Sequence, residues 1–406
     1  MSKCREPGLT LHEALHLMIP ERRYDIDWLR VFATYLLFPF HVSKVFDVPP
    51  FYHIKNAELS GNLALFTTFV HQWHMPLFFL LAGWSLQASL SRRSTGAVLH
   101  ERVLRIFVPF LFGCCTLCVG LGYVEKILMP GKDVSFLAFV PQFFTNLEYF
   151  TWGHLWFLIY LFTFTLLYMP LFMAIRRIRP GSDAISAGWL YLPLIPLVLM
   201  QLVLRIRWPG MQNLYDDWAN FCFYSSFLIL GFTTGRLPAV EEAISREWRR
   251  AGVIGLALSV VFLLSRNEDL RNGVAGYFLQ GVNGPIISEY GWKEVVAHFA
   301  YYVLGTATGY CLLMGMLGFA RAHLCFENKA LKYLAESALP VYILHQGGIV
   351  FTGYPIIKLA WGIPAKMSLL LPVAIIATMG TYHFLVRPFS VPRFLFGMKS
   401  ARLRPR

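Results

Sequence analysis

The stretch DWLRVFATYLLFPFHVSKVFD, from Asp27 to Asp47, decides how the rest of the chain is interpreted. Its middle, Val31 to Phe40, is uncharged and mostly apolar, with Arg30 before it and His41 after it. In one helix, eleven steps of about 100° place Arg30 and His41 on nearly the same stripe, about 16 Å apart. Pro39 can bend that helix and free a backbone carbonyl near His41. Spacing alone leaves a second interpretation open, in which Arg30 is an interfacial anchor and His41 a packing residue.

The composition predicts a membrane protein. The chain has 406 residues, of which 56% are hydrophobic and 15% charged, and its mean hydropathy is +0.51. This is too apolar for a soluble protein and typical of an all-α integral membrane protein. We count ten apolar runs long enough to cross a bilayer, at about 28–47, 62–90, 105–129, 153–175, 188–206, 217–237, 250–266, 293–320, 336–357 and 367–387.

Lysine and arginine are distributed unevenly between the loops that join these runs. About twice as many lie in the predicted inner segments as in the outer ones, which predicts both termini in the cytoplasm. We expect a cytoplasmic N-terminal segment at 1–26 without a cleavable signal, a ten-helix domain at 27–388 and a basic cytoplasmic tail at 389–406. Basic loops that face anionic lipid explain the net charge of +13, so no nucleic-acid partner is expected.

Histidine recurs in the apolar runs, whereas Asp and Glu are nearly absent from their middles. The histidines in the runs or at their ends are His41, His71, His74, His154, His298, His345 and His383. Ionisable groups in a membrane are costly and often functional, and imidazole suits general-base chemistry. For any one of them the alternative is a hydrogen-bonded histidine between packed helices. No further ligands can be assigned around His71 and His74, so no metal site is expected.

Four arginines lie on a short predicted inner loop and at the start of the next run. They are Arg92, Arg93, Arg102 and Arg105. Arg102 and Arg105 are three residues apart and would share a face of an α-helix. Such a group can bind phosphates through charge-assisted hydrogen bonds. On composition alone, the better interpretation is an ordinary positive-inside loop.

Several motifs, in order along the chain, resemble those of the membrane acyltransferase-3 superfamily. DWLR followed by FPFH resembles its Arg–ten–His motif, and ERVLRIFVP (101–109) resembles its Arg-x-x-Arg motif. HMPLFFLLAGWSL (74–86), GHLWFLIYL (153–161) and SALPVYILHQ (337–346) resemble further motifs of the family. RPFSVPRFLFGMK (387–399) resembles the tail of its glucan-biosynthesis-protein-C-like members. Each motif alone is weak, but their order on ten predicted spans is fairly specific for the superfamily.

The resemblance implies an O-acyltransferase that takes an acyl group from cytoplasmic acyl-CoA and places it on a carbohydrate hydroxyl at the outer face. His41 then matches the catalytic histidine, Arg30 its paired arginine, and Arg102 and Arg105 the donor-side motif, with Arg92 and Arg93 as further donor contacts. Possible supporting residues in the matched motifs are His74, His154, Tyr342 and His345. No bound cofactor is expected, because acyl-CoA is a substrate.

The resulting hypothesis is a multi-pass acyltransferase of a bacterial inner membrane, with acyl-CoA, an envelope carbohydrate and the lipid bilayer as partners. The acyl group would be acetyl or succinyl, and His41 would be either a general base or a transient acyl acceptor. The competing hypotheses are a transporter or flippase without covalent chemistry, and a structural partner of an envelope complex. His53, in the first outer loop, is expected to contribute little.

Overall fold

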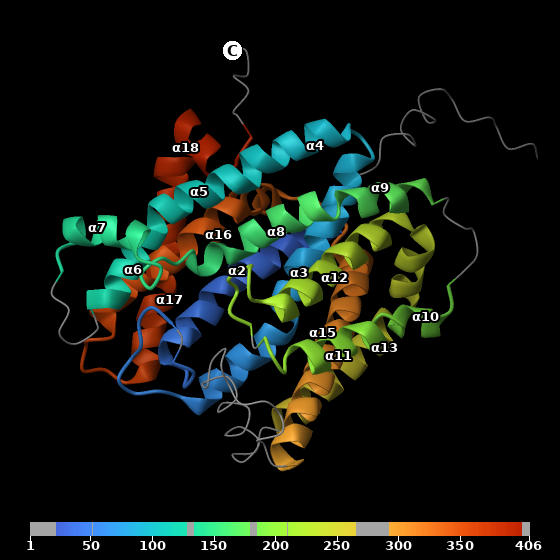
Figure 1. The fold of residues 1–406 in the computed structure, drawn as a ribbon, viewed down its shortest axis with the longest axis horizontal. Helices are drawn as coiled ribbons and strands as arrows, with labels where there is room; N and C mark the ends of the chain where they lie inside the picture. The colour runs from blue at the N-terminus through green and yellow to red at the C-terminus, as the bar shows by residue number, and fades with distance from the viewer. Residues whose placement is uncertain are drawn as a thin grey trace, which may run out of the picture.

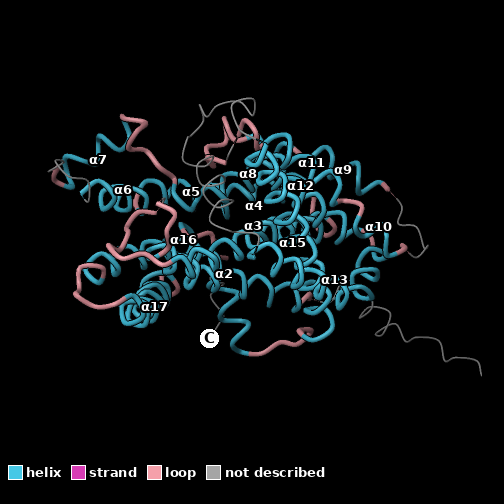
Figure 2. Tube along the Cα trace, turned by 90° about the horizontal axis from the view of Figure 1, so that it is seen from below, coloured by secondary structure: helices cyan, strands magenta, loops and turns pink. Residues whose placement is uncertain are grey.

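The computed structural model describes residues 22–50, 52–127, 134–178, 185–208, 210–264 and 292–399. In this part of the chain the regular elements are all helices, joined by loops, and there is no strand, as Figure 2 shows. Its one β-type contact is an isolated bridge between Asp47 and Ser60. The prediction of an all-α protein is therefore confirmed for the described residues.

The stretch that opens the sequence argument forms one helix, α2 (Tyr24–Phe46), which continues through Pro39. Acidic residues in its first turn and Lys44 in its last turn complement the helix dipole. At Asp47 the backbone becomes extended and the helix ends. Because α2 spans 30–41 without a break, Arg30 and His41 lie about 16 Å apart along it, as predicted.

Helix α3 (Gly61–Leu90) packs against α2 and, on its other side, against α12 (Trp218–Arg236). The crossing of α3 and α12 depends on two glycines. A β-carbon built on Gly83 would lie 2.0 Å from the carbonyl oxygen of Leu228, and one on Gly231 would lie 1.9 Å from that of Leu80. No side chain fits at either position, so the two backbones touch. Close contact through small residues is a common way to pack helices in membranes.

The remaining helices surround this centre (Figure 1). Helix α16 packs on α2 and α17, and α13 packs along α15. Helices α8 and α9 are bent by 55° relative to each other. The bounds are α4 (Thr95–Arg102), α5 (Val108–Cys115), α6 (Leu117–Ile127), α7 (Phe136–Thr145), α8 (Trp156–Leu167), α9 (Met169–Arg177), α10 (Ala187–Tyr191), α11 (Leu194–Leu204), α13 (Pro238–Leu264), α15 (Trp292–His323), α16 (Lys329–Ile356), α17 (Ile363–Gly380) and α18 (Ser390–Leu395).

Two short π-helical segments interrupt this pattern, at Val103–Phe107 and Thr381–Val386. The first lies between α4 and α5 and contains Arg105. A π-helical turn is wider than an α-helical turn, so the α-helical spacing rule for Arg102 and Arg105 does not hold across it. Such segments often occur at functional sites.

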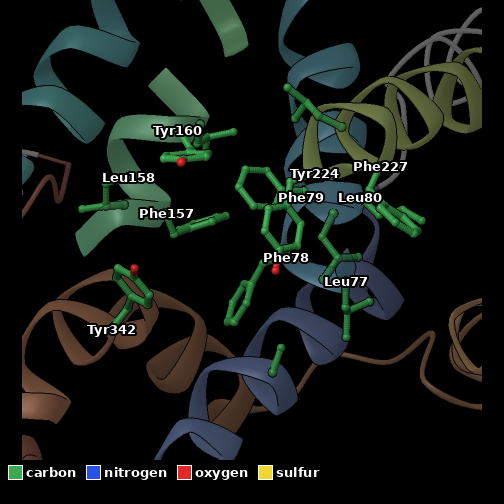
Figure 3. Close-up of a cluster of buried hydrophobic side chains, with 14 of the residues drawn as sticks. Leu77, Phe78, Phe79, Leu80, Phe157, Leu158, Tyr160, Tyr224, Phe227 and Tyr342 are labelled. Carbon is green, nitrogen blue, oxygen red and sulfur yellow. The ribbon is translucent and has the colours of Figure 1, made fainter. Parts of the chain in front are cut away.

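A buried aromatic cluster joins α3, α8, α12 and α16 (Figure 3). The rings of Phe79 and Tyr224 are stacked with their centroids 5.1 Å apart. The ring centroid of Phe157 lies 4.8 Å from that of Phe79 and 5.6 Å from that of Tyr342, and both pairs have edge-on geometry. Offset and edge-on pairs of this kind add to the stability that burial alone supplies. The cluster fixes the position of Tyr342, and with it the part of α16 that enters the site.

Four described helical segments are each long and apolar enough to cross a membrane: Thr95–Lys126, Ala187–Leu204, His298–His323 and Ile363–Val386. The bent pair α8 and α9 would make a fifth. Helices lie in all ten predicted apolar ranges, whereas the number of spans and the side of each terminus remain predictions. The predicted outer loop at 267–292 except for its last residue, most of the segment 1–26 and the end of the tail lie outside the described residues.

Candidate active site

Three histidines from three different elements form a row. His41, on α2, faces His345, on α16, with ring centroids 5.0 Å apart. His154, just before α8, lies on the other side of His345 with centroids 4.9 Å apart. These residues are far apart in sequence, and the packing of α16 between α2 and the start of α8 brings them together. We call His41, His345 and His154 the histidine row.

The hydrogen bonds of His345 fix which of its nitrogens is free. Its Nδ1 lies 2.7 Å from the carbonyl oxygen of Tyr342, which can only accept, so Nδ1 carries the proton. A neutral imidazole then has its lone pair on Nε2. That Nε2 is buried and has no hydrogen-bond partner among the described residues. The same is true of Nδ1 of His41 on the facing ring.

Two buried nitrogens without partners on facing rings require an explanation. Buried polar atoms are nearly always hydrogen-bonded, and the exceptions are often catalytic groups or places that a ligand occupies. Because the Nδ1–H of His345 is engaged by the Tyr342 carbonyl, the Nε2 lone pair of His345 remains available to a reacting group.

His154 and Tyr342 hold the row in place. The Nε2 atom of His154 donates to the carbonyl oxygen of Ile343 at 2.9 Å, and its Nδ1 lies 2.6 Å from the side-chain amide of Gln346, whose N–H group is the donor that this Nδ1 requires. The hydroxyl of Tyr342 donates to the backbone carbonyl of His154. Both nitrogens of His154 are thus already engaged. The structure brings both predicted supporting residues to the site, where they join the start of α8 to α16.

His74 is close to the row but serves a different purpose. Its Nε2 donates to the backbone carbonyl of Ala33 at 2.7 Å, and its ring lies 5.1 Å from that of Phe78 and 6.1 Å from that of Phe40. This is the hydrogen-bonded histidine between packed helices that the sequence analysis gave as the alternative. It joins α3 to the middle of α2. No group of three or more His, Cys, Asp or Glu side chains in the described chain is arranged to hold a metal ion.

The loop between α2 and α3 covers the same end of α2 and brings two further rings to the row. The ring of Tyr52 stacks on that of His41 with centroids 5.6 Å apart. The next residue, His53, bonds to Glu125 of α6 at 2.7 Å. Neither residue was singled out from the sequence as part of the site, and His53 was expected to contribute little. Contacts between residues 72 positions apart leave no pattern in a single sequence.

A charge cluster on Asp47 anchors this loop. The Asp47 carboxylate is fully buried and lies 2.9 Å from Nζ of Lys44 and 2.7 Å from Nζ of Lys55. Thr67, on α3, donates its hydroxyl to the same carboxylate at 2.8 Å. Lys55 also donates to the backbone carbonyls of Lys44 and Asp47. These contacts, which we call the Asp47 clamp, fix the path of the loop over the end of α2.

The predicted arginines gather toward the other end of α2. Arg30 donates to Oδ1 of Asp27 and to the hydroxyl of Ser85, both at 2.8 Å. Arg102 lies within electrostatic range of Arg30, Arg93 and Arg105. In Figure 1 this region, around α4 and the start of α5, is at the opposite edge of the molecule from the loop that follows α2.

Glu101 holds part of this arginine group together. Nη1 of Arg93 lies 2.6 Å from Oε2 of Glu101, and Nη1 of Arg105 lies 3.3 Å from Oε1 of the same carboxylate. Arg102 is different, because its Nε is buried and has no hydrogen-bond partner among the described residues. Arg92 is exposed on the same loop. One carboxylate among four cationic side chains leaves a net positive site, which suits an anionic ligand.

A family of known proteins matches most of this chain. The model of the acyltransferase-3 family, which describes an acyltransferase domain, matches residues 23–383. The chain belongs to the acyltransferase-3 family. The resemblance expected from the motifs is therefore confirmed, and both the histidine row and the arginine group lie inside the region that matches.

Several curated relatives of this acyltransferase-3 chain share a name. Glucans biosynthesis protein C of Escherichia coli strain SMS-3-5 / SECEC is 24% identical over 349 residues, which cover 82% of this chain and 83% of the relative. The proteins of that name from Escherichia coli strains K12 and O81 (strain ED1a) match with the same identity and coverage. No solved structure matches the chain.

Proposed function

We propose that this protein is an integral-membrane O-acyltransferase that moves an acetyl or succinyl group from cytoplasmic acyl-CoA to a hydroxyl of a cell-envelope glycan. Membership of the acyltransferase-3 family supports the reaction class. The name of the relatives, glucans biosynthesis protein C, supports a glucan or a related carbohydrate as acceptor. The apolar helices support a multi-pass protein, and the inner membrane of a bacterium is the location we propose.

One observation carries the proposal: His41 and His345 face each other with buried nitrogens that have no partner in the described chain. A hydroxyl is a weak nucleophile until a base removes its proton. A lone pair held ready on a buried imidazole supplies that base. His41 fits this role directly, or it accepts the acyl group briefly before transfer. His345 has its proton fixed on Nδ1, so its Nε2 can take a proton from His41.

The arginine group is the proposed donor site. Arg93 and Arg105 pair with Glu101, Arg30 pairs with Asp27, and Arg102 adds a fourth cation, so the phosphates of acyl-CoA would meet excess positive charge. Arg30, on α2, is about 16 Å from His41 along the helix. A donor bound by its phosphates at one end of α2 would extend its thioester toward the row at the other. Arg92 is exposed and would add a weaker contact.

This arrangement requires a defined topology. We propose ten spans within 27–388, with the residues before and after them in the cytoplasm, so that the arginine group faces the cytoplasm and the Asp47 clamp faces the outside. The excess of Lys and Arg on the predicted inner loops supports this orientation. It places the donor site on the side where acyl-CoA is available.

The test is acyl transfer by protein reconstituted in nanodiscs, with acetyl-CoA or succinyl-CoA as donor and a glucose oligosaccharide as acceptor. His41→Ala should lower the transfer rate about 10²–10⁴-fold, the usual cost of losing a general base. The matched control is His383→Ala, whose ring contacts Tyr333 at the opposite end of α16 from His345. Size-exclusion profiles establish that each variant is folded. Transfer by His41→Ala at the parent rate would refute the catalytic assignment.

A further inference from the structure

We infer that His53 and Glu125 form a second base at the outer end of the site, which takes the proton from the acceptor hydroxyl. This inference rests on the proposed acyltransferase function and assigns the acceptor side of the same site. The His53–Glu125 pair would then remove the hydroxyl proton, and His41 would have the other role proposed for it, as the transient acceptor of the acyl group.

The hydrogen bond sets the tautomer of His53. Its Nδ1 lies 2.7 Å from Oε2 of Glu125, and a carboxylate can only accept, so Nδ1 carries the proton. The lone pair is therefore on Nε2. That nitrogen has no hydrogen-bond partner among the described residues, and the His53 side chain is 10% exposed. A carboxylate that orients an imidazole and stabilises its protonated form is the arrangement found in serine-hydrolase triads.

The space that His53 Nε2 faces is kept open by a glycine. A β-carbon built on Gly153 would lie 3.7 Å from Nε2 of His53 and 3.4 Å from Oε1 of Gln346. Gly153 has a φ of +46°, in the left-handed region that side chains rarely adopt. A side chain at this position would thus both strain the backbone and enter the space between the two polar groups. The glycine leaves room for a hydroxyl there.

The residues around this space are adjacent to members of the histidine row. Gly153 directly precedes His154, and Gln346 directly follows His345. Gly153 thus brings the chain next to His154 within reach of His53, and the neighbour of His53, Tyr52, stacks on His41. Glu125 is 42% exposed, so the His53–Glu125 pair lies between solvent and the row. An acceptor that arrives from the outer side would meet this pair before it reaches His41.

The proposed step balances as follows. His41 first attacks the thioester: a carbon–nitrogen bond forms, the carbon–sulfur bond breaks with its electron pair on sulfur, and the thiolate takes up the proton that His41 loses. The acceptor hydroxyl then gives its proton to His53 Nε2, and its oxygen attacks the carbonyl carbon of the acyl group on His41. A carbon–oxygen ester bond forms, the carbon–nitrogen bond breaks with its electron pair on the His41 nitrogen, and the proton on His53 passes to His41 through water. No oxidant, reductant or further reactant is needed.

The deciding experiment compares two acceptors in the full-length protein in nanodiscs, with acetyl-CoA as donor. A glucose oligosaccharide needs a base, whereas hydroxylamine attacks through a neutral nitrogen that need not first lose a proton. His53→Ala should lower transfer to the sugar about 10²–10⁴-fold and leave transfer to hydroxylamine nearly unchanged. Glu125→Gln should give an intermediate loss with the sugar. Added imidazole should restore part of the sugar activity of His53→Ala.

Matched controls are His323→Ala and Glu148→Gln, which replace an exposed histidine and an exposed glutamate away from the row. Both should transfer to either acceptor like the parent. If His53→Ala lowered the rate of transfer to the sugar and to hydroxylamine by the same factor, the loop would only shape the site. If the rate of transfer to the sugar were unchanged, His53 would take no proton. Either result overturns this inference and leaves the proposed function intact. A parent protein that transfers to neither acceptor overturns both.

Discussion

Replacing Asp47 by Asn tests whether the Asp47 clamp stabilises the protein and positions the outer loop. The substitution keeps the size of the side chain but removes its charge. The ammonium groups of Lys44 and Lys55, now 2.9 and 2.7 Å from the carboxylate, would lose their shared counter-charge. The amide would also present N–H donors to groups that are themselves donors. The hydroxyl of Thr67 would keep a partner only in one orientation of the amide.

The size of the effect follows from burial. Removing one partner of a buried ion pair typically costs about 3–5 kcal/mol. The Asp47 side chain is 0% exposed, but the lysine side chains are 18% and 19% exposed, so water can partly solvate the ammonium groups left behind. We therefore expect a loss of about 2–4 kcal/mol, reduced from the fully buried value by this solvent screening.

The assay is thermal unfolding of the detergent-solubilised protein, followed by intrinsic fluorescence at several scan rates. Asp47→Asn should unfold several degrees below the parent, and Asp47→Asn with Lys55→Met should recover part of the loss because one unpaired charge is gone. Glu58→Gln, exposed on the same loop, is the control and should unfold like the parent. Unfolding of Asp47→Asn at the parent temperature would refute the argument that the clamp stabilises the fold.

Three further predictions follow from other parts of the structure. The double variant Arg102→Gln with Arg105→Gln should raise the KM for acyl-CoA with little change in kcat, as measured by initial rates. An unchanged KM for acyl-CoA would mean that these arginines only help to set the membrane orientation. Gly83→Val should abolish folded protein in size-exclusion profiles because its side chain would overlap the α12 backbone, whereas Gly380→Ala, with nothing within 4 Å, should fold normally. In a cysteine-free background, Ala57→Cys should react with a membrane-impermeant maleimide from outside; labelling of Lys332→Cys in intact cells would reverse the proposed orientation.

The sequence predicted the features that depend on one helix and its period. Arg30 and His41 lie at the two ends of an uninterrupted part of α2, because ten apolar residues between them favour a continuous helix in a membrane. The arginines after residue 90 were likewise visible as a charge cluster. The role of Glu101 within that cluster, and the π-helical turn that contains Arg105, could not be predicted because both depend on backbone geometry rather than on spacing.

The residues that complete the site were hidden for a different reason. Tyr52, Glu125 and Gln346 reach the row from a loop and two helices that the chain brings together only when it folds. Gln346 ends the quoted motif at 337–346, but nothing in the sequence around Tyr52 or Glu125 points to the site. The expectation that His53 contributes little rested on its place in a loop. The hydrogen bond to Glu125 removes the basis of that expectation, and the opposite outcome is now predicted.

The glycine crossing of α3 and α12 limits how the molecule can move. At Gly83 and Gly231 the backbones touch without intervening side chains, so a shift of one helix along the other would drive a leucine or an aromatic ring into a main-chain carbonyl. Transporters with alternating access depend on one bundle of helices rocking against another. A rocking motion here would have to leave α3 and α12 joined as one unit. Motion during turnover is therefore expected in the peripheral helices and the loops.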